Sequence, residues 1–528
     1  MKILTFGTCR IIQLFDKYIN DTFLESLHYL NYGCYGGHNI ISLSHDLYQT
    51  SFLLNLIKNN RKIKDTDEDY YLLEKFSVFI QNNVDYKENL LSAIPDYDIN
   101  KSIQSIHNEL NEIKYIIVEV CTLKKLVING IPLFLDINDQ NQFYKISDDE
   151  FNQDFDNLVN LIKSINSNIK IIFVSHFIYF YNEIISQRLH ILDLLKENIK
   201  KYNNCYILSV TDKITDDDLE ENRHYKPDSR YKILDTLCDK ILDIESTEIV
   251  NKMNHTGIME FNLHQYLNNK ELESYNNLNN ILNKMIEKIK LNEHNSNYVD
   301  NNKYLYSINN YLNESYNLNN NIFIDFFNVV LNNFITKIAE KYLENNIYIY
   351  NALMAVNYNS SDNRVQSQNW HRDPGGRKLI KFFFFFDTIG ELNGSLEYIP
   401  NTQYTSLSRV SNIFDYGTTE SIYPHNCNNT NEYNNFIKLA NENILITKSS
   451  NYGCISVDTS GFHRAGFCSK NYFRKYLHVL FLTKKYIINN KDPCDLYQNG
   501  FNHHKVYNID YNKIDEILGN NYYKYFYK

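Results

Sequence analysis

Two histidines and one aspartate in the second half of this chain have the residue types and the spacing of a metal-binding set. His371 and Asp373 stand two residues apart within the sequence WHRD, and His463 follows 92 residues after His371. Two imidazoles and one carboxylate can bind one face of a non-haem Fe(II) ion and leave the other coordination positions open for a co-substrate and O2. Because the set contains no thiolate, it disfavours a structural zinc site.

An arginine follows at a position that extends this chemistry. Arg474 lies 11 residues after His463, and its guanidinium is a rigid fork of donors that suits a carboxylate. Three metal ligands followed by a carboxylate anchor indicate an oxygenase that uses a 2-oxo acid as co-substrate.

Strands are the elements that must position these side chains. Residues i and i+2 of a strand point to the same side, so His371 and Asp373 can reach one ion from one short segment. Arg474 stands at the start of a strongly apolar run that continues through 476–482. A helical stretch at 323–342 is followed by other strand-like runs at 347–350, 382–386, 395–399 and 454–457. Many short strands with loops between them predict an antiparallel sandwich or barrel.

The same region resembles a known family. Residues 322–490 are similar to the phytanoyl-CoA dioxygenase family of Fe(II)/2-oxoglutarate oxygenases, through WHRD at 370–373, NGSLEYIP at 393–400, HRAG at 463–466 and Arg474. The resemblance implies a double-stranded β-helix (jelly-roll) fold. It also implies that His371, Asp373 and His463 bind iron, that Arg474 anchors 2-oxoglutarate, and that O2 is consumed in a hydroxylation.

One segment departs from the family pattern. The family has Gly-Ser-His after Ile-Pro, whereas this chain has Asn-Thr-Gln at 401–403. We expect that difference to affect contacts with the substrate more than the binding of iron. Residues 401–450 are also Asn-rich and longer than the family pattern, so we expect a lid particular to this protein.

Several residues near the predicted ligands have simpler interpretations. We interpret Phe382–Phe386 as a strand buried on both faces rather than as a substrate-binding box. Lys378 and Lys381 could assist a carboxylate, but we interpret them as exposed and solvated. Cys454 and Cys468 flank His463, and we expect them to be small buried hydrophobic residues.

The first half of the chain has a different pattern. Apolar runs at 2–6, 115–120, 170–174 and 205–210 alternate with polar, helix-prone stretches. Continuous apolar strands that alternate with helices predict a parallel sheet covered on both faces, which is a three-layer α/β domain. We assign residues 1–248 to it.

A cysteine and a histidine at opposite ends of this domain are candidates for nucleophilic catalysis. Cys9 follows the first strand, where helix N-terminal amides can lower a thiol pKa and stabilise an oxyanion. His224 would be the general base, with Glu221 three residues before it as the orienting acid. His176 is the rival base. The simpler alternative is a buried cysteine and a surface histidine.

This pair resembles the SGNH-hydrolase architecture. It is most similar to the Cys-bearing branch linked to polysaccharide biosynthesis, in which Gly-x-Cys replaces the Gly-Asp-Ser block; Gly7 and Cys9 carry that match. The resemblance implies acyl transfer to a glycan, or ester hydrolysis on one. Glu221 stands where that fold usually has Asp. Gly33, Gly36 or Gly37 would donate to the oxyanion, or would serve only as turn glycines.

Helical spacing of Leu278, Leu282, Met285 and Ile289 predicts that residues 249–321 form a helical connector or a helical cap on the next domain. Asn-rich stretches near 295–321 predict loops. We expect the oxygenase domain over 322–490 and a C-terminal tail over 491–528.

Composition and charge limit the partners. The net charge is −10 and no block of Lys/Arg dominates any segment, so nucleic acid is not an expected partner. There is no stretch of 18 apolar residues and the N-terminal apolar run is too short for a signal peptide, so we expect no membrane span. Nine cysteines without a Cys-x-x-Cys pair are typical of reduced thiols in a cytoplasmic protein.

The sequence therefore predicts a multidomain enzyme whose cofactors are Fe(II), 2-oxoglutarate and O2, and whose substrate is a small molecule, a lipid or a glycan. The N-terminal domain would add Cys-dependent acyltransferase or esterase activity. The alternatives are an acyltransferase or esterase with a degenerate oxygenase domain, and a non-catalytic binding protein. The oligomeric state stays open.

Overall fold

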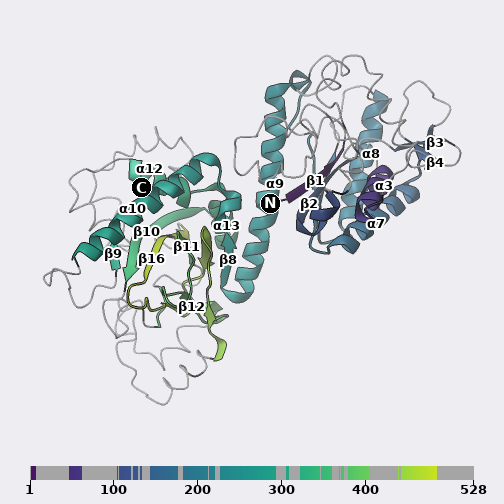
Figure 1. The fold of residues 1–528 in the computed structure, drawn as a ribbon. Helices are drawn as coiled ribbons and strands as arrows, with labels where there is room; N and C mark the ends of the chain where they lie inside the picture. Colours follow the sequence, from purple (N-terminus) through teal and green to yellow (C-terminus); the bar gives the residue numbers. More distant parts are fainter. Residues whose placement is uncertain are drawn as a thin grey trace. The chain divides into compact units, whose positions relative to one another are not determined.

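The chain forms two compact units, Met1–Ile241 and Leu242–Lys528, in the computed structural model. Figure 1 shows their helices and strands. The boundary falls inside helix α9 (Pro227–Thr256), seven residues before the boundary expected at 248. The structure describes residues 2–7, 47–61, 104, 106–120, 123–128, 131–133, 143–175, 182–211, 213–219, 226–292, 305–307, 321–344, 346–358, 368, 370–373, 379–404, 438 and 442–483.

Unit 1 contains the predicted parallel sheet. All neighbouring strands of this sheet pair in parallel. The strands are, in spatial order, β1 (Lys2–Phe6), β2 (Ile113–Val120), β6 (Lys170–Ser175) and β7 (Cys205–Leu208). The helices that the structure describes between them are α3 (Leu47–Lys58), α7 (Asp148–Ile165) and α8 (Asn182–Ile199). A short 3-10 turn, η2 (Leu110–Glu112), leads into β2.

Side chains on both faces of the central strands are buried, as the continuous apolar runs predict. Ile116 and Val118 of β2 share one hydrophobic cluster with side chains of α3, α7 and α8. Ile117 and Ile172 point to the opposite face and are also buried. The start of α7 is defined by a capping box in which Ser147 and Glu150 bond each other's backbone N–H groups.

A small antiparallel sheet in unit 1 was not expected from the sequence. Its strands, in spatial order, are β4 (Ile131–Leu133), β3 (Lys124–Ile128) and β5 (Phe143–Lys145). Another 3-10 turn, η4 (Asp216–Asp218), lies shortly before α9.

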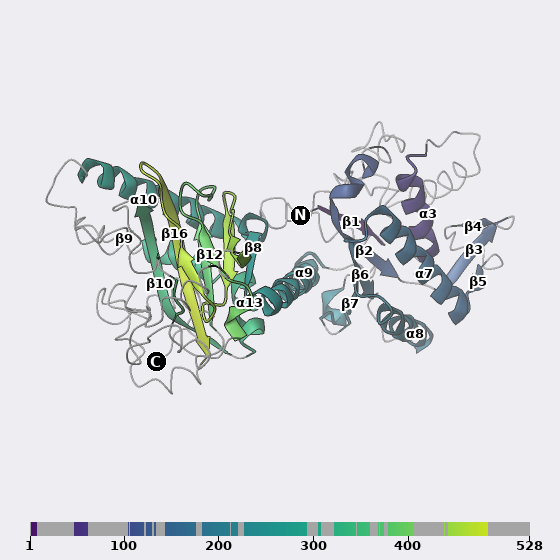
Figure 2. The same ribbon diagram turned by 90° about the horizontal axis from the view of Figure 1, so that it is seen from below.

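The described residues of unit 2 form two antiparallel sheets. The larger has six strands, in the order β8 (Ile258–Asn262), β14 (Gly453–Val457), β11 (Ile380–Phe385), β16 (Phe473–Thr483), β10 (Ile347–Tyr358) and β9 (Leu305–Ser307). The smaller has three strands, in the order β13 (Leu445–Ile446), β12 (Leu396–Tyr398) and β15 (His463–Ala465). Figure 2 shows the long strands β10 and β16 side by side.

The hydrophobic core of unit 2 lies between the two sheets. One cluster joins Phe385 and Tyr476 of the large sheet to Leu396 and Tyr398 of the small sheet. Since side chains of both sheets meet in one cluster, the sheets face each other. This is the antiparallel sandwich that the short strands predict.

Helices cover the outer face of the large sheet. Among the described helices these are α10 (Asn269–Asn292) and α13 (Asn333–Leu343), while α12 (Asn321–Val330) packs against α10 and a 3-10 turn η5 (Leu263–Tyr266) precedes α10. Tyr275 of α10 donates its hydroxyl hydrogen bond to the carbonyl of Phe385, and Lys475 of β16 donates to Asn279 and Asn283 of α10. Helix α10 is therefore a cap on this unit.

The segment expected at 249–321 also supplies strands. Strand β8 pairs with β14 along its whole length, and β9 pairs with β10 inside the stretch expected as loops. The helical stretch at 323–342 is two helices, because Asn332 caps the second through a 2.9 Å hydrogen bond from the Phe334 N–H. None of the helices in the described part of the chain combines the length and the apolar character that a membrane crossing requires.

Candidate metal centre

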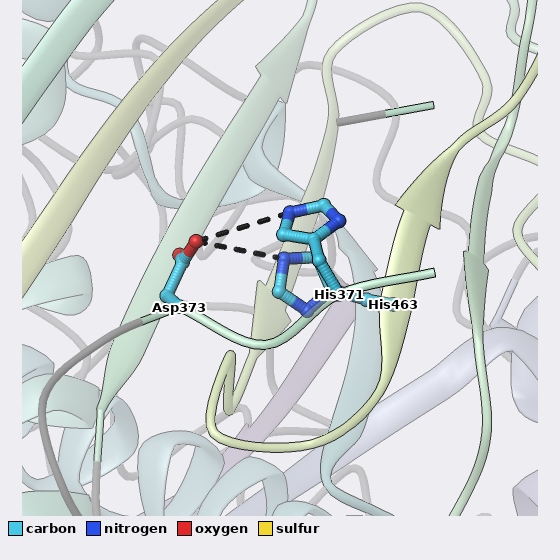
Figure 3. Close-up of side chains that lie close together, drawn as sticks. All are labelled: His371, Asp373 and His463. Atoms are coloured by element: carbon cyan, nitrogen blue, oxygen red, sulfur yellow. Dashed lines mark ion pairs between the residues drawn. The ribbon is translucent and has the colours of Figure 1, made fainter. Parts of the chain in front are cut away.

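His371, Asp373 and His463 meet between the two sheets of unit 2 (Figure 3). The Nε2 atom of each histidine lies 3.9 Å from Oδ1 of Asp373. Ligand atoms of all three residues lie within 4.8 Å of one another, and all three side chains are buried. Metal bonds to imidazole nitrogen and carboxylate oxygen are about 2.0–2.2 Å long, so two ligands of one ion lie at most about 4.4 Å apart. Both 3.9 Å separations fall within that limit.

Backbone pairing places the two histidines opposite each other. His371 N–H donates to the carbonyl of His463 and His463 N–H donates back to His371, each at 3.0 Å. Asp373 N–H donates to the carbonyl of Thr459 at 2.9 Å. His371 forms an isolated bridge rather than part of a regular strand, so the expected WHRD strand is only a short extended segment anchored on the chain around β15.

Hydrogen bonding and burial prepare His463 to bind a cation through Nε2. Its Nδ1 lies 3.0 Å from the carbonyl of Gly461. A carbonyl only accepts, so Nδ1 carries the proton and the lone pair remains on Nε2. Burial, followed by the influence of His371, lowers the pKa of His463 to about 3. The ring is therefore neutral near neutral pH, as a metal ligand must be.

Lys381 holds the other oxygen of Asp373, which corrects the expectation that this lysine is exposed. Its side chain is 10% exposed, and Nζ lies 2.7 Å from Oδ2 of Asp373. Burial raises the pKa of Asp373, but the charge of Lys381 outweighs it, and the pKa ends well below its usual range. Lys381 lies on the face of β11 that also carries Phe385, which packs against the small sheet. Lys378 lies outside the described residues.

Asp458 organises the loop that carries the third ligand. Its Oδ1 accepts from the Ser460 N–H at 2.9 Å and from the Ser460 hydroxyl at 2.6 Å. Tyr342 of α13 donates to Oδ2 at 2.5 Å. Burial raises the pKa of Asp458. The sequence interpretation missed this residue, although Asp followed two positions later by Ser is a local turn signal.

Arg464 and Glu397 form an ion pair next to the backbone pairing of His371 with His463. Arg464 donates from Nε to Glu397 at 2.5 Å, and its guanidinium carbon lies 4.4 Å from the centre of the Trp370 ring. Trp370 and Arg464 each neighbour a ligand histidine in sequence, so this contact reinforces the pairing of the two segments.

Two glycines of the family-like segments allow β12 and β15 to come together. Gly394 has a φ of +79°, a conformation that favours glycine. A Cβ there would lie 2.6 Å from the carbonyl oxygen of Gly466. The N–H of Gly466 donates to the carbonyl of Ser395 at 2.7 Å. The NGS and HRAG motifs therefore mark one close backbone approach.

Arg474 lies on β16 with its side chain on the same side as Tyr476, over whose ring its guanidinium carbon lies at 5.5 Å. It is 5% exposed and donates from Nη1 to the carbonyl of Gly394. Asn357 of β10 is its register partner. The buried Oδ1 of Asn357 has no hydrogen-bond partner within the described residues. The guanidinium of Arg474 is therefore a buried cation between the two sheets, and its register partner Asn357 is a second buried polar side chain.

Aromatic side chains line the strands between the metal ligands and Arg474. Phe383 lies 5.6 Å from His478 and 6.2 Å from Tyr476, measured between ring centres. Phe382 and Phe384 are fully buried on the opposite face, which confirms the buried-strand interpretation for them. Phe383 differs, because it is partly exposed.

The two cysteines near His463 match their expectation. Cys454 and Cys468 are buried free thiols, and burial raises the pKa of each. Neither belongs to the group of metal-binding side chains found among the described residues.

The candidate residues of the N-terminal site lie in the part of the chain that the structure does not describe. Cys9, Glu221 and His224 lie outside the described residues, as do His176 and the glycines at 33, 36 and 37. The structure does describe β1, which ends at Phe6, and the bridging residue Gly7.

No protein-family model matches this sequence, and no curated protein matches it. It is similar to the solved structure of the non-haem α-ketoglutarate-dependent epimerase SnoN from nogalamycin biosynthesis, at 10% identity over 46% of this chain and 84% of SnoN, with a TM-score of 0.30. AviO1 from Streptomyces viridochromogenes Tue57 is similar at 11% identity over 45% of this chain and 95% of AviO1, with a TM-score of 0.30. EctD from S. alaskensis, solved with bound Fe, is similar at 12% identity over 45% of this chain and 76% of EctD, with a TM-score of 0.30. Likenesses at these values carry no conclusion about activity, which rests on the residues of the site.

Proposed function

We propose that unit 2 is an Fe(II)- and 2-oxoglutarate-dependent oxygenase. The observation that carries the proposal is the buried group of two imidazoles and one carboxylate, whose ligand atoms lie within 4.8 Å of one another. Nitrogen and oxygen donors without thiolate suit Fe(II). A bound Fe(II) ion with three protein ligands would supply open coordination positions for 2-oxoglutarate and O2.

Each residue has a defined task in this proposal. His371 and His463 bind the ion through nitrogen, and Gly461 fixes the His463 tautomer. Asp373 binds through Oδ1, which faces both histidines. Arg474 binds the distal carboxylate of 2-oxoglutarate. Its bond to Gly394 uses one of the five guanidinium donors.

The proposed reaction converts an unactivated C–H bond of the substrate into C–OH. One atom of O2 enters the product alcohol and the other enters succinate, while 2-oxoglutarate loses CO2. The protein excludes water from the ligands by burying them between two sheets. The substrate is a small molecule, a lipid or a glycan.

We assign this activity to the whole of Leu242–Lys528 rather than to 322–490 alone. Strand β8 extends the six-stranded sheet. Helix α10 covers the outer face of that sheet, where its Tyr275 donates to the carbonyl of Phe385 and its Asn279 accepts from Lys475 of β16. A fragment that starts at residue 322 would lack both elements, so it would expose buried side chains of the sheet.

The direct test is iron-dependent conversion of 2-oxoglutarate to succinate by the purified full chain. We expect succinate and CO2 in equal amounts when Fe(II), O2 and 2-oxoglutarate are supplied, and we expect no succinate from His371→Ala or Asp373→Ala. Absence of succinate from the unmodified protein, with Fe(II) bound at the site, would contradict the proposal.

For unit 1 we propose acyl transfer or ester hydrolysis on a glycan. Its support is the parallel sheet, because the carboxyl ends of β1, β2, β6 and β7 share one edge, and Cys9 follows β1 by three residues. Cys9→Ser should abolish hydrolysis of a chromogenic acetyl ester and leave succinate formation unchanged. Equal ester hydrolysis by the variant would remove Cys9 from the mechanism.

A further inference from the structure

A buried lysine contacts the carboxylate of the metal-binding set. Nζ of Lys381 lies 2.7 Å from Oδ2 of Asp373, while the two histidines face Oδ1. The exposed fractions of the Lys381 and Asp373 side chains are 10% and 5%. The pair is therefore an ion pair in a low-dielectric environment, where charges interact more strongly than at the surface.

The positive charge of Lys381 weakens the attraction of the site for a metal cation. When both histidines are in the neutral form that a metal ligand needs, they and the aspartate together carry a charge of −1, which attracts a divalent cation. The ammonium of Lys381 cancels that charge within one contact distance. The site therefore attracts the metal less strongly than it would without Lys381. Lys381 is not explained by fold stability either, because burial of an ion pair does not by itself stabilise a fold.

The same charge has the opposite effect on a bound anion. With a divalent ion in place, the centre carries +2 with Lys381 and +1 without it. An anionic chelating co-substrate therefore binds more favourably when Lys381 is present. Lys381 also occupies Oδ2, which leaves Oδ1 for the ion and restricts the carboxylate to one coordination position.

We propose that Lys381 is a positioning residue that lowers the affinity of the site for the metal alone and raises the affinity of the metal-bound site for the anionic co-substrate. Metal and co-substrate therefore bind cooperatively. This inference rests on the proposed function of the site. It assigns Lys381 a role toward the chelating end of the co-substrate, whereas Arg474 serves the distal carboxylate.

The test uses anaerobic titration calorimetry with Co(II), which does not turn over, and then 2-oxoglutarate on the Co(II)-loaded full chain. Lys381→Met removes the charge and the hydrogen bond. We expect it to bind Co(II) alone about tenfold more tightly and to bind 2-oxoglutarate about tenfold more weakly. The visible absorption of bound Co(II) should also change, because Oδ2 of Asp373 becomes available to the ion.

Two further variants separate charge from structure. Lys381→Gln keeps a hydrogen-bond donor but carries no charge, so we expect both affinities to shift in the same directions as in Lys381→Met. Lys475→Met removes another buried lysine of unit 2, one that contacts Asn279, Asn283 and Asp387 rather than the metal-binding set. We expect that control to leave both affinities unchanged.

The outcomes are distinguishable. Weaker binding of both Co(II) and 2-oxoglutarate by Lys381→Gln would show a structural role only and overturn the inference. Wild-type affinities in Lys381→Gln would also overturn it, because charge would then be irrelevant. Failure of the unmodified protein to bind Co(II) would contradict the proposed function itself, and Co(II) binding without 2-oxoglutarate binding would contradict the co-substrate assignment.

Discussion

His371 and His463 are joined by a reciprocal pair of backbone hydrogen bonds, each 3.0 Å long. The two imidazole rings lie with their centres 4.2 Å apart. The distance between the proposed ligands is therefore set by pairing of backbone segments that are 92 residues apart in sequence. Any change that separates these segments will separate the ligands.

Removal of one ligand should abolish tight metal binding. His371→Ala leaves one imidazole and one carboxylate, which are too few to hold Fe(II) or Co(II) strongly. We expect at least a hundredfold weaker Co(II) binding, measured by anaerobic calorimetry. His264→Ala is the control, because His264 lies on η5 and packs on Tyr452 instead. Full metal occupancy in His371→Ala would refute the ligand assignment.

Arg474 should affect the co-substrate and not the metal. Arg474→Met removes the buried guanidinium while it keeps an unbranched side chain over Tyr476. We expect the Kd for 2-oxoglutarate to rise by about tenfold to a hundredfold, since charge-assisted hydrogen bonds are the stronger ones. Co(II) affinity without co-substrate should stay within about twofold. Unchanged 2-oxoglutarate affinity would assign the distal carboxylate to another cation.

Tyr342 should support the metal centre from α13. Its hydroxyl donates to Asp458, so Tyr342→Phe leaves a buried carboxylate oxygen without this donor. We expect a loss of about 1–3 kcal/mol in stability and about tenfold weaker Co(II) binding. Tyr266→Phe removes a comparable buried hydroxyl contact, to Glu245. That control should lose stability without loss of metal affinity, and equal metal affinities in the two variants would rule out the role of Tyr342.

Metal-free protein should lose stability as the pH falls from about 6.5 toward 3. Burial lowers the pKa of His463 to about 3, whereas a histidine in the unfolded chain titrates near 6.5. In this window the unfolded chain binds a proton that the folded chain does not, so unfolding becomes more favourable as pH falls. The contribution is fully present above about pH 6.5.

Chemical denaturation of the metal-free protein at several pH values measures this effect. The contribution from His463 is at most about 1.4 kcal/mol per pH unit. His463→Asn should show a shallower dependence between pH 6.5 and 4. Asp373 has a lowered pKa, so its own contribution is lost only below about pH 3.8. Identical slopes for the variant and the unmodified protein would contradict a neutral, buried His463.

Local patterns in the sequence were sufficient for many elements. Continuous apolar runs predicted β1, β2 and β6 of a parallel sheet, and short runs predicted β14 and β16 of an antiparallel one. These predictions work because burial of one or both faces imposes a periodicity on neighbouring residues. Strands β8 and β9 escaped prediction, because they lie at the edges of the sheet and have mixed polarity.

The sequence by itself determined which side chains can bind a metal, since residue type and the two-residue spacing of His371 and Asp373 define the ligand chemistry. Only the tertiary structure decided that His463 stands opposite His371 and that Lys381 turns inward onto Asp373. A lone lysine in an aromatic strand resembles any solvated lysine in sequence. The physical reason for the difference is that sheet register, set by contacts distant in sequence, determines which face of β11 meets the other sheet.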